Sequence, residues 1–333
     1  MDNRQSKTRG MLAFVATVAA IGYASVFATP SIAADSYPSR PITIVVPFGP
    51  GSGTDVVARL IAAHLGNAFG SPVVVDNKPG AGGMIGSAAV ARAQPNGYTL
   101  VMGGNTTHSV VTALWKNVPY DPVRDFAPVA RVVTFISMLV VNPDLPVKTA
   151  AEFVAYAKKN PGKIRYGYGN SSGRIGGEMI RQRAGIDLIA VAYKSNPQTV
   201  TDIMSGNIEA GVIDQGTALP HIKAGKVRPI AVLAPRRSSA LPDVPTLGET
   251  AVREGVDITA WSSVMAPAGT PVDIRKRLSD ELRKFTERGD MKSKLIVNGA
   301  ELSHIGLEEF PAFQKAEEAR WTGMAKAAGI KPE

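Results

Sequence analysis

The sequence lacks cysteine entirely over its 333 residues. No disulfide can therefore stabilise the fold, and no thiol is available for catalysis or for binding a metal. Histidine is also scarce: its four copies are far apart and include no H-x-x-x-H pair, which disfavours a metal centre. The nucleotide-binding pattern G-x-x-x-x-G-K-[ST] is absent as well, and we expect neither a metal nor a cofactor.

Long hydrophobic runs are missing everywhere except near the N-terminus. There, three basic residues precede the almost wholly apolar run Met11–Ala28, and small residues up to Ala34 offer a cleavage site. This order of segments is typical of a secretory signal peptide. An uncleaved membrane anchor is the alternative, but the run is short for a membrane span. We predict a signal peptide over residues 1–34, a mature chain that begins near Asp35, and a location in the periplasm.

The charge balance is basic, with 37 lysines and arginines against 28 acidic residues and a formal charge of +9. The predicted signal peptide holds +2 of this charge, which leaves about +7 on the mature chain. A basic surface often binds nucleic acid. Here, however, the basic residues are scattered and are not interleaved with aromatic residues. We interpret the charge as a mild preference for anions and expect no nucleic-acid partner.

The stretch Ile42–Arg59, ITIVVPFGPGSGTDVVAR, is the most informative part of the chain. Its first five residues are β-branched, as in a buried strand, and the prolines and glycines that follow end that strand. Thr54 and Asp55 are then expected to cap a helix. Backbone N–H groups and the positive end of the helix dipole would meet at this loop, which suits an anion. An ordinary strand-to-helix turn that binds nothing is an equally open alternative.

The order of strand, polar loop and helix recurs along the chain. Strands and helices that alternate at this spacing indicate βαβ units and a parallel sheet. Ligands of such sheets bind beyond the carboxyl ends of the strands. In the first part of the chain, the loops near Gly51, Gly83 and Asn105 are expected at one such edge. In the second part, the loops at 169–174 and 193–196 and the strand end at Asp214 form another.

Two chain crossings divide this pattern into two domains. The apolar segment Ala130–Val141 leads into the second set of strands, and the chain returns to the first set near Trp261. We predict one lobe from residues 35–140 plus 261–333 and a second lobe from residues 141–260. Each lobe is expected to be a mostly parallel sheet flanked by helices, in the α/β class. A ligand cleft between the lobes and hinges at the crossings complete the predicted architecture.

One motif points to an enzyme instead. The pentapeptide Gly169–Gly173 matches G-x-S-x-G between a predicted strand and a predicted helix. A hydrolase would use Ser171 as its nucleophile, with Asp214 and His304 following in chain order. The alternative is a serine- and glycine-rich loop that contacts a ligand. We favour the loop, because the pentapeptide is short and a hydrolase usually carries a large residue beside its serine.

Polar and aromatic residues at loop edges are further candidates for ligand contact. His108 lies in a polar loop, where it either faces a ligand or has no ligand role. Arg174 lies at a helix start, where its charge opposes the dipole and a carboxylate partner would relieve it. A solvated arginine is the alternative. Phe48 and Tyr193 each end a strand at a loop, either as walls of a cleft or as ordinary core residues.

Several long motifs carry a family resemblance. They are PSRPITIVVPF from Pro38, VVVDNKPGAGG from Val73, PNGYTL from Pro95, LPDVPT from Leu241 and APAGTP from Ala266. With these motifs in this order, the chain resembles the Bug family, the periplasmic solute-binding proteins of tripartite tricarboxylate transporters (TctC-like). The resemblance runs from about Tyr37 to the end of the sequence and is highly specific.

The resemblance implies a type II periplasmic-binding-protein fold that closes on a small carboxylate and delivers it to membrane permease subunits, without catalysis. We expect a monomer, because both lobes must move freely. A sensor that reports the ligand to a signalling partner is the alternative to a carrier. The residues expected at the ligand are Phe48, Gly51, Ser52, Gly53, Thr54, Asp55, Asn105, Thr106, Thr107, His108, Asn170, Ser171, Ser172, Arg174, Tyr193, Ser195 and Asp214.

The loops depart from the family pattern at three places. Ser52 stands between two glycines where the family usually has paired glycines, and Ser195 follows the Tyr-Lys turn where glycine is usual. Arg174 stands where a histidine is frequent, and it favours a ligand with a second carboxylate. These departures bear on the identity of the ligand and leave the expected fold unchanged.

Overall fold

The computed structural model describes residues 37–250, 252, 256–297 and 299–333. The predicted signal peptide and the predicted start of the mature chain near Asp35 therefore lie outside the described residues. The chain divides into the units Met1–Ser39 and Arg40–Glu333, and every element named below lies in the second unit. Over the described ranges, no helix combines the length and the apolar character needed to cross a membrane.

The first sheet has the strand order β11-β4-β10-β3-β1-β2. Its strands are β1 (Ile42–Val46), β2 (Val73–Asn77), β3 (Thr99–Gly104), β4 (Phe126–Phe135), β10 (Ala260–Pro267) and β11 (Ala300–Ile305). Strand β1 pairs in parallel with both β2 and β3, with Thr43 opposite Val74 and Thr99. Strand β10 is antiparallel to β3 and β4, and β11 is antiparallel to β4.

The second sheet has the strand order β7-β6-β8-β5-β9. Its strands are β5 (Ser137–Val141), β6 (Ile164–Tyr168), β7 (Leu188–Ala192), β8 (Ala210–Asp214) and β9 (Arg228–Val232). Strand β6 is parallel to β7 and β8, whereas β5 is antiparallel to β8 and β9. The α/β class is confirmed, but both sheets are mixed and not mostly parallel. The antiparallel pairs involve β4, β5 and β10, the strands at the crossings.

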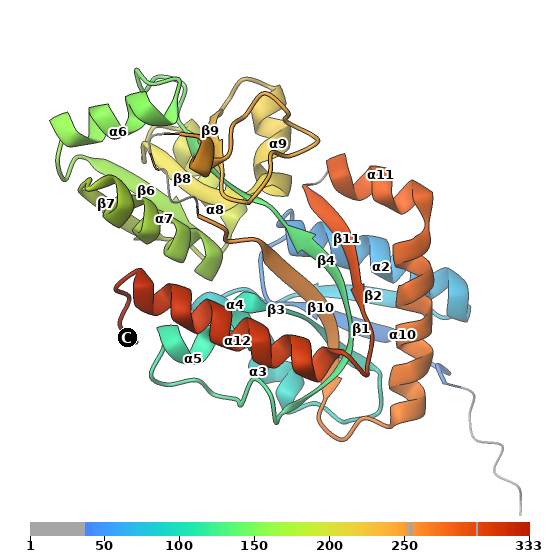
Figure 1. Cartoon of the computed structure of the whole chain (residues 1–333). Coiled ribbons are helices and arrows are strands. Elements are labelled where there is room, and N and C mark those ends of the chain that lie inside the picture. Colours follow the sequence, from blue (N-terminus) through green and yellow to red (C-terminus); the bar gives the residue numbers. More distant parts are fainter. Residues whose placement is uncertain (1–36, 251, 253–255, 298) are drawn as a thin grey trace, which may run out of the picture. The chain divides into compact units, whose positions relative to one another are not determined.

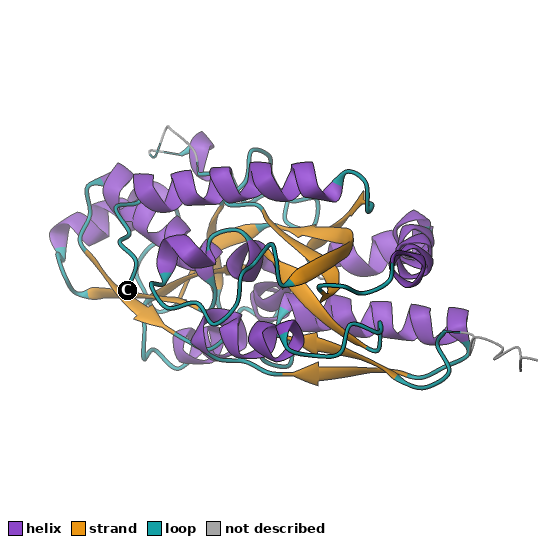
Figure 2. Cartoon of the chain, turned by 90° about the horizontal axis from the view of Figure 1, so that it is seen from below, coloured by secondary structure: helices purple, strands orange, loops and turns teal. Residues whose placement is uncertain are grey.

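Helices cover both sides of the strands (Figure 2). Around the first sheet they are α2 (Gly53–Phe69), the 3-10 turn η1 (Ala81–Gly83), α3 (Met84–Ala91), α4 (Asn105–His108), α5 (Val111–Leu114), α10 (Val272–Glu287), α11 (Gly289–Val297) and α12 (Phe310–Ala327). Around the second they are α6 (Ala150–Lys159), α7 (Ser171–Ala184), α8 (Asn196–Met204), α9 (Gln215–Lys223) and the 3-10 turn η2 (Leu247–Glu249). Figure 1 shows the two groups of elements, joined by β4 and β10.

Each sheet has its own hydrophobic core. Trp261 and Phe310 belong to the core of the first, with ring centroids 6.0 Å apart in an edge-to-face arrangement. Met138, Ile203 and Ile213 belong to the core of the second and are almost fully buried. Because burial of such side chains stabilises each layer separately, the two groups can act as two packed bodies.

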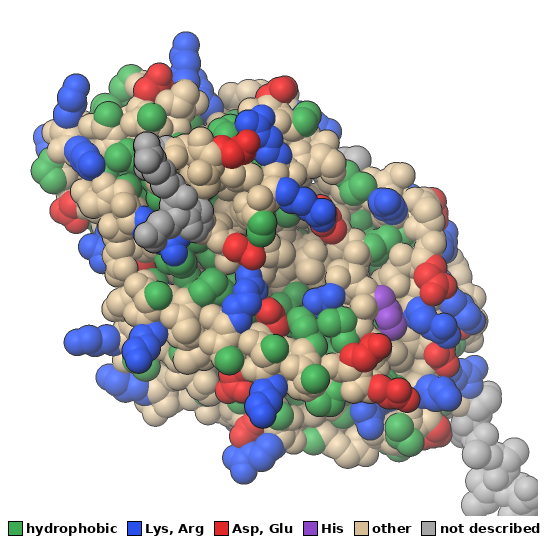
Figure 3. Space-filling view, in the orientation of Figure 1, with side chains coloured by type: hydrophobic (Ala, Val, Ile, Leu, Met, Phe, Trp, Pro, Cys, Tyr) green, Lys and Arg blue, Asp and Glu red, His purple; other side chains and the backbone are tan. Residues whose placement is uncertain are grey.

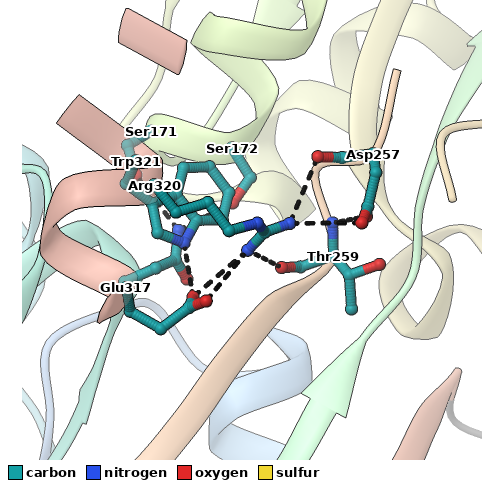
Figure 4. A network of polar contacts seen from close by, with 8 residues as sticks. Ser171, Ser172, Asp257, Thr259, Glu317, Arg320 and Trp321 are labelled. Carbon is teal, nitrogen blue, oxygen red and sulfur yellow. Dashed lines mark hydrogen bonds and ion pairs between the residues drawn. The ribbon is translucent and has the colours of Figure 1, made fainter. Parts of the chain in front are cut away.

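The chain crosses from the first sheet to the second at Ile136, the single residue between β4 and β5. The segment expected as one long strand is therefore broken, and the expected lobe boundary after Val140 falls inside β5. The chain returns to the first sheet at β10. Just before this strand, Arg320 of α12 donates hydrogen bonds to the carbonyl oxygens of Asp257 (3.2 Å) and Thr259 (3.3 Å) (Figure 4). Helix α12 thus anchors the second crossing to the first sheet.

Side-chain caps fix the start of three helices. Ser52 caps α2, where its Oγ accepts from the N–H of Asp55 at 3.2 Å. The prediction that Thr54 and Asp55 cap this helix was wrong, because α2 begins at Gly53. Asn170 caps α7, and Asp214 caps α9. Each cap follows a strand or its loop directly, so the strand ends determine where the helices begin.

Gly177 lies where α7 crosses the buried ring of Tyr166, and this contact predicts a large loss of stability on substitution. A Cβ at Gly177 would lie 2.1 Å from Cε2 of Tyr166. We expect Gly177→Ala to lower the free energy of unfolding by about 1–3 kcal/mol or more. The matched control is Gly323→Ala on α12, where nothing lies within 4 Å. Its stability should rise by up to about 1 kcal/mol. Equal urea midpoints for the two variants would contradict this packing.

Candidate functional site

A cavity lies where loops of the two sheets meet, and we call it the central cavity. Its lining comes from the loop after β1, the ends of β3, β4 and β8, the starts of β5 and β10, and the starts of α2, α4, α7 and α8. Asp214 at the end of β8 is also the cap of α9. The cavity has a volume of about 40 Å³ in this arrangement, against roughly 30 Å³ for the liquid volume of a single water molecule. In this arrangement of the lobes the cavity therefore matches a group the size of a carboxylate.

Two segments of the first sheet that were expected at the ligand line the central cavity. The loop after β1 and the first turn of α2 provide Phe48, Ser52, Gly53 and Thr54. The turn α4, directly after β3, provides Asn105 and Thr106, which are both buried. The expected convergence of these two loops at one sheet edge is therefore present in the structure.

The second sheet contributes Asn170, Ser172, Ser195 and Asp214, all expected from the sequence. The carboxylate of Asp214 accepts hydrogen bonds from Nδ2 of Asn196 at 2.6 Å and from the N–H and Oγ1 of Thr217. These donors compensate its negative charge. A Cβ at Gly53 would lie only 2.8 Å from Oδ1 of Asp214, so the two lobes are in close contact there.

Helix N-termini surround the central cavity, and Asp214 is the only formally charged side chain among its described lining residues. In the described chain, α2, α7, α8 and α9 all begin at its wall. The N-terminus of a helix carries a partial positive charge and N–H groups that have no partner within the helix. Among the described lining residues there is no lysine or arginine. The cavity therefore suits a small anion that is held by dipoles, amides and hydroxyl groups.

Hydroxyl and amide groups connect the lobes directly beside the cavity. Nδ2 of Asn105 lies 2.9 Å from Oγ of Ser172, and Oγ1 of Thr106 lies 2.7 Å from Oγ of Ser171. Asn105 and Thr106 belong to the first sheet, whereas Ser171 and Ser172 begin α7 of the second. These contacts require a closed arrangement of the two lobes.

Gly51 and Asp55 were expected at the ligand, but the structure places them outside the lining of the central cavity. Asp55 is buried and accepts from the N–H of Gly51 (2.9 Å), from Arg59 (3.0 Å) and from Asn77 (2.9 Å). Burial opposes ionisation, but these hydrogen bonds keep the pKa of Asp55 below its usual value. Asp55 thus holds the shape of the loop after β1.

Thr107 and His108 also lie behind the wall of the central cavity and do not line it. The Nδ1 atom of His108 is 2.8 Å from Oγ1 of Thr107, and its ring packs edge-to-face on Phe126 with centroids 4.4 Å apart. Complete burial lowers the pKa of His108 to about 3. His108 is therefore a neutral core residue in this arrangement, with a packing role instead of the expected ligand contact.

Ser171, Arg174 and Tyr193 line a different space, which we call the outer cavity. It has a volume of about 300 Å³ by the same measure, and its wall also includes Trp115, Tyr168 and Glu333. Burial and a hydrogen bond to Asp202 raise the pKa of Tyr193 to about 12. The carboxylate that meets Arg174 is that of Glu333, with Nη1 and Oε1 2.6 Å apart. A ligand carboxylate was expected at Arg174, but in the structure Arg174 pairs with Glu333 of the chain itself.

The central cavity is also lined by residues that were not named as ligand contacts, although Gly104, Gly169 and Asn196 lie in loops expected at the ligand. Asn196, at the start of α8, could have been found from the sequence, because it is a polar residue beside Ser195 in a predicted loop. The others are buried strand or loop positions that resemble core in the sequence. They are Met102, Gly103, Gly104, Phe135, Ser137, Gly169, Ala260, Trp261 and Ser262.

The hydrolase alternative fails at Ser171. Its hydroxyl contacts Thr106 and, at 3.4 Å, Asn105, while Asp214 contacts Asn196 and Thr217. His304 lies on β11 of the other sheet. The three residues named for a triad therefore make no hydrogen bond to one another among the described residues. Within the same ranges, no group of three or more potential metal-ligating side chains lies together.

These features define a two-lobed binding protein, with a ligand-sized cavity between lobes that are joined at two crossings. A family model described as "Tripartite tricarboxylate transporter family receptor" (TctC) matches residues 57–330. The chain therefore belongs to this family, and the resemblance to the Bug family is confirmed. Members are solute-binding receptors and not enzymes, and they work outside the cytoplasm.

Individual relatives agree over most of their length. BugT of Bordetella pertussis (strain Tohama I) is 32% identical over 303 residues, which cover 90% of this chain and 93% of BugT. The solved structure of R. palustris Rpa4515 with adipate has a TM-score of 0.87 at 32% identity, covering 89% of this chain and 100% of that one. MatC from Rhodopseudomonas palustris with bound malate has a TM-score of 0.80 at 28% identity, covering 86% and 99%.

The burial of His108 predicts how stability depends on pH. Its folded pKa is depressed, so its contribution is complete above the unfolded pKa of about 6.5 and is lost as the pH falls below that value. The loss should approach about 1.4 kcal/mol per pH unit. We expect His108→Leu to flatten the fall in urea midpoint between pH 6.5 and pH 4.5, roughly the window below the ordinary histidine pKa. His221→Gln is the control, and equal slopes for both variants would contradict the role assigned to His108.

Proposed function

We propose that this protein captures a small carboxylate in the central cavity and delivers it to the membrane permease subunits of a tripartite transporter. The convergence of the N-termini of α2, α7, α8 and α9 on one cavity carries this proposal. Each such dipole stabilises a nearby anion by about 0.3–1 kcal/mol, and more when the site is partly buried. Adipate and malate, which the two structural relatives hold, support a carboxylate as the ligand.

The surroundings of Asp214 indicate how such a ligand lies. Asp214 carries negative charge beside Gly53, so a second anion close to it would be repelled. We place the ligand carboxylate near Asn105, Thr106 and Ser172, where amide and hydroxyl donors come from both lobes. A ligand group that reaches Asp214 should be a hydrogen-bond donor, such as a hydroxyl. Hydrogen bonds to charged groups contribute about 1.5–3 kcal/mol each, so a few suffice for tight binding.

We also propose that the lobes move as two bodies about Ile136 and residues 256–259. This places the functional lobe boundary a few residues before the expected one at 140, because β5 belongs to the second sheet. Closure about these crossings would bring Asn105 and Thr106 against α7 and exclude water from the ligand. We propose a monomer in the periplasm, because both lobes must move freely.

Basic and acidic side chains are interspersed over the face of the molecule shown in Figure 3.

A thermal-shift screen of the chain from Asp35 onward tests the proposed function. The panel would contain acetate, benzoate, malate, adipate, citrate and glutamate, each with its neutral amide or alcohol as a control. A ligand at about a hundred times its dissociation constant should stabilise the protein by about 2.7 kcal/mol. This raises the melting temperature by a few degrees, roughly 2–4 °C per kcal/mol. If protein that has been unfolded and refolded responds to no acid, the proposed function is wrong.

Gly53 allows a sharper test of lobe closure. A Cβ there would lie 2.8 Å from Asp214 Oδ1 and 3.1 Å from Phe135 when the lobes are closed. We expect Gly53→Ala to weaken binding of the acid that shifts the native protein by at least about tenfold, or 1.4 kcal/mol. The clash with Asp214 exists only on closure, whereas the 3.1 Å approach to Phe135, on β4 of the same lobe, does not depend on closure. The unliganded protein should therefore lose much less stability than ligand affinity.

The control for this variant is Gly66→Ala on the same helix. A Cβ at Gly66 meets its nearest atom, the carbonyl oxygen of Ser71, at 3.6 Å, which is ordinary contact. Calorimetric titration should therefore give the native affinity for Gly66→Ala. Equal affinities for Gly53→Ala and Gly66→Ala would show that closure does not bring Gly53 against Asp214.

A further inference from the structure

The segment after α12 is attached to the first lobe through its main chain. The N–H of Glu333 donates to the carbonyl oxygen of Leu114 at 3.1 Å, and the N–H of Lys116 donates to a main-chain oxygen of Glu333 at 2.9 Å. Leu114 ends α5, a helical turn that contacts α12 and α4 of the first lobe. The backbone of Glu333 therefore moves with that lobe.

The side chain of Glu333 reaches the second lobe. Its Oε1 lies 2.6 Å from Nη1 of Arg174, in the first turns of α7. Arg174 is largely sheltered, with 16% of its side chain exposed. Ser171, which contacts Thr106 of the first lobe, is on the same stretch of α7. The ion pair thus lies next to the hydroxyl contacts that form only when the lobes are closed.

We propose that Glu333 is a positioning residue for lobe closure, whose carboxylate pairs with Arg174 across the mouth of the cleft and favours the closed arrangement. The outer cavity supports this, because its wall combines Trp115 of the first lobe with Tyr168 and Tyr193 of the second. The proposal depends on the closure motion proposed above and not on the identity of the ligand. The pair replaces the ligand carboxylate expected at Arg174 by a carboxylate of the chain itself.

The pair has a defined consequence for ligand exchange. It forms in the closed arrangement with or without a ligand, so it stabilises both closed forms by the same factor. If the unliganded protein is mostly open, this factor appears as slower ligand release and higher affinity. An ion pair with an exposed partner changes such an equilibrium by about twofold to fivefold. Salt should weaken the effect, because Glu333 is 64% exposed.

Closure can be measured without a ligand, because the chain contains no cysteine that would compete for a label. Spin labels at Lys158→Cys on α6 and Lys276→Cys on α10, both exposed, report the distance between the lobes by pulsed electron resonance. In about 20 mM NaCl, Glu333→Gln should raise the ratio of open to closed protein about twofold to fivefold. In about 0.5 M NaCl, the native protein should approach the ratio of the variant.

The control is Glu308→Gln, which removes the same charge from an exposed glutamate of the first lobe and should leave the ratio unchanged. Arg174→Gln should reproduce Glu333→Gln, and the double variant should add nothing to either single change. The proposal is overturned if Glu333→Gln matches Glu308→Gln, if the two single changes add, or if the unliganded protein is entirely open or entirely closed in every variant. Because no acid is present, these outcomes are independent of the test of the proposed function.

Discussion

The first turn of an α-helix leaves backbone N–H groups without partners inside the helix, and this constraint organises the centre of the protein. Strands or strand loops of both sheets lead into α2, α7, α8 and α9, which all begin around one cavity. The side chains of Ser52, Asn170 and Asp214 each accept a hydrogen bond from one of these N–H groups. A small anion between the lobes would accept from others, without a buried lysine or arginine whose own desolvation would cost free energy.

Closure depends on close approach as much as on polar contacts. Gly53 lies against Asp214 and Phe135 with no room for a Cβ, and Asn105 and Thr106 contact α7 directly. The two crossings allow the lobes to reach this arrangement, and Arg320 fixes the second crossing to α12. Small residues at the contact, polar pairs around it and anchored hinges together describe a protein that encloses its ligand.

The sequence predicted the elements that depend on neighbouring residues. The pattern of strand, glycine-rich loop and helix predicted ligand contacts at Ser52, Gly53 and Thr54, and the same logic pointed to Asn170 and Asp214. All five residues line the central cavity. This logic failed where residues far apart in the sequence determine the position of a side chain. The ring of Phe126 packs on His108 and helps to hold His108 in the core. Glu333 pairs with Arg174, which lies 159 residues earlier in the sequence. The crossing strands were missed as lining because buried strand residues look the same whether they face a core or a cavity.

In the proposed binding mode, helix N-termini and neutral donors hold the ligand carboxylate, and cationic side chains do not. A crystal structure of the protein with the acid that shifts its melting temperature tests this most directly. The carboxylate oxygens should lie about 2.7–3.1 Å from donors at Asn105, Thr106 and Ser172 in the central cavity. A carboxylate bound instead to Arg174 or Lys194 in the outer cavity would contradict it.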